Sequence, residues 1–259
     1  MKRFLYWAAT LFLAAGLFIA CEKPENPDNG PDDDPIELPT VLRGQGSFSK
    51  NLNKQMKYSV WLPAGYDENK TYPFLYLLHG YGDDSNSWMD KGGADKIAQS
   101  YQQANGVPMV IIMPDGLTSF YVGTWEKYFR EELRPEVENK YHFNGKRAVA
   151  GLSMGGYGTL YNVLAHPSEY TYGYAMSPAT QDLDQLAYAQ TDPLNVPRIT
   201  VESGTQDYTV SIESVRTFVS ALQNAQIRVE FIERSGGHDW NFWPVCLKKA
   251  LVKIGESFQ

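Results

Sequence analysis

The chain has 259 residues, of which 43% are hydrophobic and 20% are charged, and its net charge is −7. This composition is that of an ordinary globular protein, and no basic stripe points to a nucleic-acid partner. Two cysteines and four scattered histidines lack the spacing of metal ligands, so we expect neither a metal nor another cofactor.

The first 20 residues have a basic start and an apolar run over 4–20, which is typical of a signal peptide. A transmembrane anchor is the alternative, because a run of about 17 apolar residues is near the lower limit for spanning. Residues 17–21 (LFIAC) resemble a bacterial lipobox, although Phe18 departs from the usual leucine. The resemblance implies that Cys21 is lipidated and that the protein touches a membrane only through this lipid. We expect it on the outer membrane or cell surface, with the periplasmic side as the alternative.

Residues 21–40 are rich in proline and acidic side chains, with seven acids and one lysine between 22 and 40. A segment with so little apolar content cannot bury a core, so it is predicted to be a disordered tether. It resembles the surface-export signal of some Gram-negative lipoproteins, but a plain solvated spacer fits equally well. Residues 41–259 then form one catalytic domain.

Two antiparallel strands are expected at the start of this domain, over 43–49 and 54–62, because apolar side chains alternate in the second. Continuous apolar runs predict buried parallel strands over 72–78 and 107–113. Further strands are expected over 148–150, 172–176, 198–203 and 228–232. Helical patterns lie between them, over 94–104, 124–141, 154–166, 210–224 and 241–254, with a short helix or small lid at 182–189. This alternation predicts an α/β fold, with a mostly parallel sheet covered by helices on both faces and no large cap domain.

A G-x-S-x-G pattern occupies residues 151–155 (GLSMG), between a predicted strand and a predicted helix. In such a nucleophile elbow the serine, here Ser153, sits on a strained turn that exposes its hydroxyl. The pattern alone is weak, because chance produces it in about one chain in ten of this length. An acid and a histidine later in the chain are therefore needed to support it.

Asp207 and His238 follow the predicted strands 198–203 and 228–232, so both fall at the carboxyl edge of the sheet with Ser153. The order serine, aspartate, histidine is that of the α/β-hydrolase fold. We expect His238 to act as general base for Ser153 and Asp207 to fix the imidazole tautomer. Asp182 and Asp184 are the best rivals for the acid. Asp115 also follows a predicted strand, but it precedes the serine and so breaks the order.

Residues 79–82 (HGYG) form a glycine-containing loop after the predicted strand 72–78. Hydrolases of this class take one oxyanion-hole N–H from such a loop and the other from the residue after the nucleophile. The expected donors are the backbone N–H groups of Tyr81 and Met154. The alternative is that the glycines only make a turn, and His79 is interpreted as structural.

Taken together, several motifs resemble the esterase D-like branch of α/β hydrolases; they are LLHG (77–80), MPDG (113–116), GLSMGG (151–156) and GHDW (237–240). That branch includes feruloyl esterases of carbohydrate esterase family 1, acetylxylan esterases, S-formylglutathione hydrolases, siderophore esterases and mycolyltransferases. The resemblance spans about residues 45–255. It implies the fold and the catalytic triad but does not identify the substrate.

Aromatic side chains near these motifs suggest a surface for a phenolic ring or a sugar, namely Trp88, Tyr121, Tyr157 and Trp240. Packing in the core is the alternative for each. An outward-facing esterase suits polymer breakdown, so we expect a serine carboxylesterase that removes feruloyl or acetyl esters from plant cell-wall xylan. A siderophore or general short-chain esterase is the first alternative, and a non-catalytic glycan-binding lipoprotein is the second.

Overall fold

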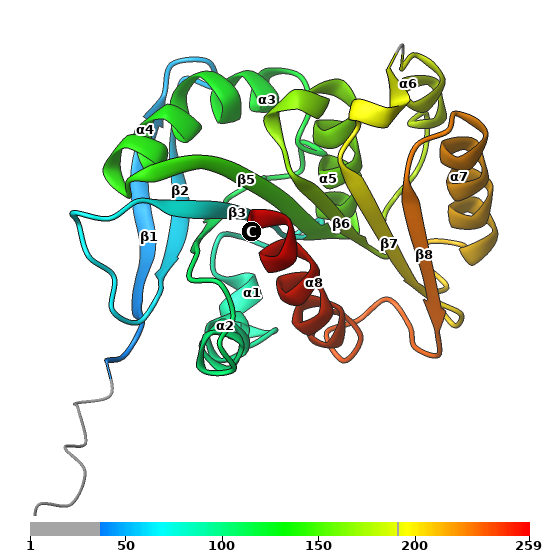
Figure 1. Cartoon of the computed structure of the whole chain (residues 1–259). Helices are drawn as coiled ribbons and strands as arrows, with labels where there is room; N and C mark the ends of the chain where they lie inside the picture. The colour runs from blue at the N-terminus through cyan, green and yellow to red at the C-terminus, as the bar shows by residue number, and fades with distance from the viewer. Residues whose placement is uncertain (1–36, 191) are drawn as a thin grey trace, which may run out of the picture. The chain divides into compact units, whose positions relative to one another are not determined.

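The computed structural model describes residues 37–190 and 192–259, and from Glu37 onward they form one compact unit. Its centre is an eight-stranded sheet with the order β1-β2-β4-β3-β5-β6-β7-β8 (Figure 1). The strands are β1 (Thr40–Ser49), β2 (Lys54–Leu62), β3 (Tyr72–Leu78), β4 (Val110–Pro114), β5 (Phe143–Leu152), β6 (Tyr172–Met176), β7 (Arg198–Gly204) and β8 (Val229–Arg234). The predicted signal peptide, Cys21 and nearly all of the predicted tether lie outside the described residues.

The sheet is mostly parallel, as the sequence predicts. Only β1 and β2 are antiparallel to their neighbours, and β2 pairs with β4 through Val60 and Ile112. From β4 to β8 every pairing is parallel. This is the α/β-hydrolase arrangement, and the described residues contain no large cap domain. The predicted strand 107–113 begins three residues later than expected, at Val110.

Helices cover both faces of the sheet, with α3 to α7 on one face and α1, α2 and α8 on the other (Figure 1). The helices are α1 (Ser87–Asp90), α2 (Ala94–Gln103), α3 (Thr124–Tyr128), α4 (Arg134–Lys140), α5 (Met154–Ala165), α6 (Asp184–Tyr188), α7 (Ile212–Asn224) and α8 (Trp243–Phe258). Successive side chains of a strand point to opposite faces. In β3, Tyr76 packs into the core on the side of α3 to α7, and Leu77 packs into the core on the side of α1, α2 and α8. Both side chains are fully buried.

The predicted helix over 124–141 is interrupted in the structure. A π-helical turn, Phe129–Leu133, separates α3 from α4. Pro135 explains the interruption, because it has no N–H to donate back along a regular α-helix. The apolar stripe survives, since Trp125, Phe129, Leu133 and Val137 are all buried.

Within the described ranges, no helix is long and apolar enough to cross a membrane, and no cluster of three or more His, Cys, Asp or Glu side chains could hold a metal ion.

Candidate active site

Ser153 stands at the sharp turn between β5 and α5, with φ 52° and ψ −114°. A residue with a side chain rarely adopts this conformation, so the strained turn predicted from the G-x-S-x-G pattern is present. The Ser153 N–H donates to the carbonyl of Met176 at 2.8 Å, which fixes the turn to β6. Gly155 allows α5 to cross the end of β3, because a Cβ there would lie 2.4 Å from the Leu78 carbonyl oxygen.

Three side chains from three separate loops meet at the carboxyl edge of the sheet. His238 Nε2 lies 2.8 Å from Ser153 Oγ, and His238 Nδ1 lies 2.7 Å from Asp207 Oδ2. Since the carboxylate can only accept, the proton of the imidazole is on Nδ1 and Nε2 is left to accept from the Ser153 hydroxyl. The arrangement has the geometry of a serine nucleophile with its general base and orienting acid.

The Asp207 side chain is almost fully buried, and its loop supplies it with hydrogen bonds. Its Oδ1 accepts from the backbone N–H groups of Thr209 at 2.9 Å and Val210 at 2.8 Å. Burial alone would raise the pKa of Asp207, but the hydrogen bonds from His238, Val210 and Thr209 outweigh it and hold the pKa below its usual value. The acid is therefore ionised throughout the neutral range.

The rival acids do not reach the imidazole. Asp115 receives the Leu117 N–H at 2.9 Å, and its nearest basic group is His79. Asp182 is exposed, and Asp184 begins α6 and is also exposed. Among the described residues, Asp207 is the carboxylate that pairs with His238.

Two residues that line the pocket with Ser153 have backbone N–H groups without an acceptor among the described residues. Met154 is the first residue of α5, so its N–H has no acceptor within the helix. Tyr81 lines the same pocket as Ser153 and Met154, and its N–H has no acceptor among the described residues. These are the two donors that the sequence predicts for an oxyanion.

A pocket of about 550 Å³ opens beside Ser153, a size that suits a small organic group. Its lining residues come from five separate segments of the chain; they are Tyr81, Phe120, Ser153, Met154, Ala179, Thr180, Gln181, Thr209, Val210, Ser211 and Ser214. None of them carries a charge. The sequence did not single out Phe120 or Val210, because only the tertiary fold brings their loops to Ser153.

The sequence-based assignment of the aromatic residues is wrong for Trp88 and Tyr121. Both are at most 1% exposed, and neither lines the pocket. The Trp88 indole N–H instead donates to the Leu78 carbonyl, and the Tyr121 hydroxyl donates to the His79 carbonyl.

The other two predicted aromatic residues are half-buried, but neither lines the pocket itself. Trp240 packs edge-on against Trp88 and Trp243. Tyr157 packs edge-on against Phe120, with the ring centroids 5.4 Å apart, and so supports a pocket residue.

An ionic cluster around the buried Glu202 holds the loop that carries His238. Glu202, at 0% exposure, accepts from Arg234 at 2.5 Å and from Lys249 at 2.9 Å. Arg234 also donates to the Phe242 carbonyl at 2.6 Å, so the two ends of the histidine loop are tied together. Sequence reasoning missed this cluster, although a glutamate inside the apolar strand 198–203 is a signal for it.

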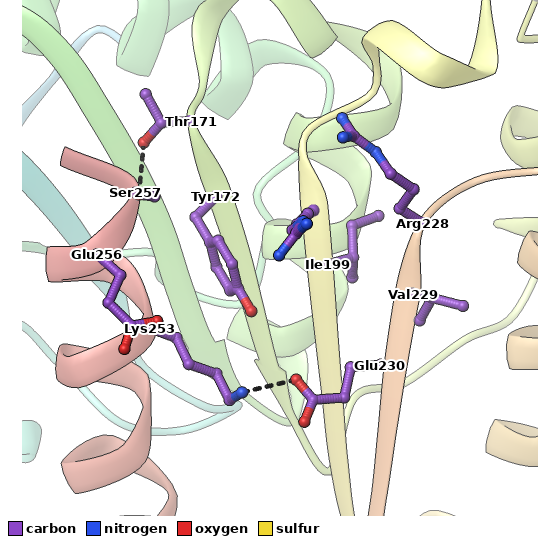
Figure 2. A pocket seen from close by; sticks show the side chains of 10 residues that line it. Thr171, Tyr172, Ile199, Arg228, Val229, Glu230, Lys253, Glu256 and Ser257 are labelled. Atoms are coloured by element: carbon purple, nitrogen blue, oxygen red, sulfur yellow. Dashed lines mark hydrogen bonds and ion pairs between the residues drawn. The ribbon is translucent and has the colours of Figure 1, made fainter. Parts of the chain in front are cut away.

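A second cavity, of about 530 Å³, lies where β6, β7 and β8 begin, at the opposite edge of the sheet from Ser153 (Figure 2). An ion pair of 2.7 Å between Lys253 and Glu230 crosses its lower side. Its other charged residues are Arg198, Arg228 and Glu256. It contains no serine–histidine pair, so it is not a candidate for the same chemistry.

The family model described as "Putative esterase" matches residues 49–254. An endo-1,4-beta-xylanase/feruloyl esterase from Xylanibacter ruminicola is 29% identical over 226 residues. The match covers 80% of this chain but only 30% of that protein. An acetyl esterase from Caldicellulosiruptor saccharolyticus is 26% identical, over 79% of this chain and 94% of its own length.

Solved structures show the same fold. A ferulic acid esterase superposes with a TM-score of 0.79 and 25% identity, covering 86% of this chain and 100% of that one. A carbohydrate esterase family 1 ferulic acid esterase from Anaeromyces mucronatus gives a TM-score of 0.75. It is 21% identical and covers 87% of this chain and 94% of its own, so it supports the fold alone.

Proposed function

The chain belongs to this esterase family and is a carboxylic ester hydrolase; from that premise we propose that Ser153, His238 and Asp207 carry out its reaction through a covalent acyl-enzyme. The main support is the continuous chain of hydrogen bonds from the hydroxyl of Ser153 through His238 to the carboxylate of Asp207. The intact triad disfavours the non-catalytic glycan-binding alternative.

Acylation begins when His238 Nε2 takes the hydroxyl proton of Ser153 and Oγ forms a bond with the ester carbonyl carbon. The carbonyl electrons move to oxygen, where the N–H groups of Tyr81 and Met154 stabilise the negative charge. When the oxyanion collapses, the bond to the alkoxy group breaks, and His238 gives its proton to the departing alcohol. Asp207 stabilises the imidazolium while it exists.

Deacylation repeats these steps with water in place of Ser153. His238 accepts a proton from water, the hydroxide oxygen bonds to the acyl carbon, and the Ser153 oxygen leaves with the proton from the imidazolium. The product is a carboxylic acid, and no cofactor takes part in the sequence. Each oxyanion donor is expected to contribute about 3–4 kcal/mol to the transition state.

We further propose that the acyl group is a neutral aromatic acid of the feruloyl type, esterified to a plant cell-wall polysaccharide such as xylan. Two observations support this choice. The pocket beside Ser153 has no charged lining residue, and Phe120 and Tyr81 give it an aromatic side. A relative of this chain is named as a xylanase and feruloyl esterase.

A substrate panel tests the acyl group, with methyl ferulate, acetylated xylan, p-nitrophenyl acetate and a siderophore ester as its members. We expect the highest kcat/KM on methyl ferulate. Equal rates on simple aryl esters with none on ferulate would instead support the general short-chain esterase, and preference for a siderophore ester would support that alternative.

Two variants separate the chemistry from the specificity. Ser153→Ala should abolish hydrolysis of every ester. The matched control is Ser220→Ala, on the exposed side of α7, which should leave hydrolysis unchanged. Phe120→Ala should raise the KM for methyl ferulate about tenfold and change the KM for p-nitrophenyl acetate little, because only an aromatic acyl group would pack against that side of the pocket. Tyr208, which is 96% exposed, supplies the aromatic control as Tyr208→Ala.

We also propose that lipid on Cys21 tethers the enzyme to the outer membrane or cell surface, as the lipobox-like residues 17–21 indicate. Labelled palmitate should then be incorporated into the wild-type chain in a bacterial host and not into Cys21→Ser. Equal incorporation would contradict the anchor.

A further inference from the structure

We propose that His79 is a positioning residue for the oxyanion hole: its imidazole sets the plane of the Gly80–Tyr81 peptide and so aims the Tyr81 N–H at the reacting oxygen. The proposal rests on the proposed function, because it concerns the same site. His79 does not reach the substrate, since it is 1% exposed and lines no part of the pocket.

The two ring nitrogens of His79 have different, fixed partners. The backbone N–H of Gly116 donates to Nε2 at 2.7 Å and is closer than the Asp115 carboxylate at 3.6 Å, so Nε2 carries no proton. The proton is therefore on Nδ1, which lies 2.8 Å from the Gly80 carbonyl oxygen and donates to it. The Gly116 bond selects the tautomer that the Gly80 bond requires.

The Gly80 carbonyl belongs to the same planar peptide group as the Tyr81 N–H. In a trans peptide the two point in opposite directions, so a hydrogen bond that fixes the carbonyl also fixes the N–H. A second donor, the Asp83 N–H at 3.2 Å, supports the same carbonyl. The Tyr81 N–H on the other side has no acceptor among the described residues, which leaves it available for the substrate oxygen.

This peptide is also close to the nucleophile. A Cβ on Gly80 would lie 2.6 Å from Leu152 Cδ1 and 3.6 Å from Ser153 Cβ, so glycine lets the loop pack directly against the elbow. The Tyr81 side chain cannot perform the positioning itself, because it is 66% exposed.

The neighbouring carbonyls give an internal comparison. Trp88 Nε1 donates to the Leu78 carbonyl at 2.9 Å, and the Tyr121 hydroxyl donates to the His79 carbonyl at 2.8 Å. Both bonds anchor the loop, but neither carbonyl shares a peptide group with the Tyr81 N–H. Loss of the Tyr121 bond should therefore weaken the fold without redirecting the oxyanion donor.

Two isosteric variants separate the two ring nitrogens of His79. In His79→Asn the amide N–H₂ can stand near Nδ1 and keep the bond to Gly80. In His79→Gln the amide can reach the Nε2 position and serve Gly116 but not Gly80. Tyr121→Phe is the matched control for a lost buried hydrogen bond in the same loop.

We expect His79→Gln to lower kcat on p-nitrophenyl acetate about 100-fold with KM unchanged, because an oxyanion donor acts in the transition state. His79→Asn should stay within about tenfold of wild type, and Tyr121→Phe within about threefold. The Ki of an aryl trifluoromethyl ketone, whose adduct with serine carries an oxyanion, should rise in parallel with the loss of kcat. Equal losses in His79→Asn and His79→Gln, or an unchanged Ki in His79→Gln, would overturn the proposal.

A measurement on the wild-type enzyme keeps the proposal testable if the variants do not fold. In ¹⁵N-histidine NMR spectra His79 should be the Nδ1–H tautomer, and the ¹⁵N-labelled Tyr81 amide proton should move downfield when the ketone binds. The Nε2–H tautomer, or an unmoved Tyr81 amide, would overturn it. Failure of the proposed function would look different, because Ser153→Ala would then retain activity.

Discussion

The substitution Asp207→Asn tests the role of the acid without disturbing its loop. Oδ1 of Asp207 accepts from two backbone N–H groups, of Thr209 and Val210, while Oδ2 faces His238. An asparagine must keep its oxygen toward the two backbone donors, so its NH₂ group faces Nδ1 of the imidazole. His238 then carries its proton on Nε2 and can no longer accept the proton of Ser153.

The expected loss is about 10⁴-fold in kcat, or about 5 kcal/mol of transition-state stabilisation, because the wrong tautomer cannot act as base. The assay is hydrolysis of p-nitrophenyl acetate between pH 5 and 9, with urea unfolding measured in parallel. Asp207→Asn should unfold near the wild-type midpoint. Asp207→Ala leaves the N–H groups of Thr209 and Val210 without their acceptor and should lose about 1–3 kcal/mol of stability as well. Activity of Asp207→Asn within tenfold of wild type would refute this reasoning.

Three further changes probe the framework around the site. Burial raises the pKa of Glu169, but hydrogen bonds from Arg130 and Arg134 outweigh it and lower the pKa to about 2. Because the pKa is lower in the folded protein, the ionised carboxylate stabilises the fold at pH values above the unfolded-state pKa, near 4.5. Glu169→Gln should therefore cost about 1–2 kcal/mol of unfolding free energy at pH 7 after allowance for solvent exposure. The difference between variant and wild type in urea unfolding should vanish as the pH falls toward 2. Gly155→Ala puts a Cβ 2.4 Å from the last carbonyl oxygen of β3 and should lower the melting temperature and kcat together. If the variant melted like the wild type, the close approach of α5 to the end of β3 would be contradicted. Burial raises the pKa of Cys246 to about 12, so peptide mapping after iodoacetamide treatment at pH 8 should find it unmodified until urea is added.

The sequence predicted the triad because each of its members belongs to a local pattern. Ser153 lies in a five-residue motif, and Asp207 and His238 each follow a strand that the sequence predicts. Parallel strands bring those ends to one edge of the sheet without further information. The same reasoning predicted most of the strands and helices in their order along the chain, including the antiparallel β1 and β2.

The pocket could not be predicted in the same way. Whether an aromatic side chain near a motif faces the substrate or the core depends on tertiary contacts. Trp88 and Tyr121 turn inward, and they donate to the carbonyls of Leu78 at the end of β3 and of His79 in the oxyanion loop. Phe120 faces the pocket from a loop where its φ is 54°, a conformation that its local sequence does not predict. The π-helical turn before Pro135 likewise depends on how one missing N–H is accommodated.

The most direct test of the account is where a fluorophosphonate probe attaches. Attack by an activated serine displaces fluoride and leaves a stable adduct, which peptide mass spectrometry can assign to one residue. We predict a single adduct on Ser153, absent from Ser153→Ala and formed far more slowly in His238→Ala. Labelling of another serine, or undiminished labelling of Ser153→Ala, would contradict the claim that Ser153 is the nucleophile.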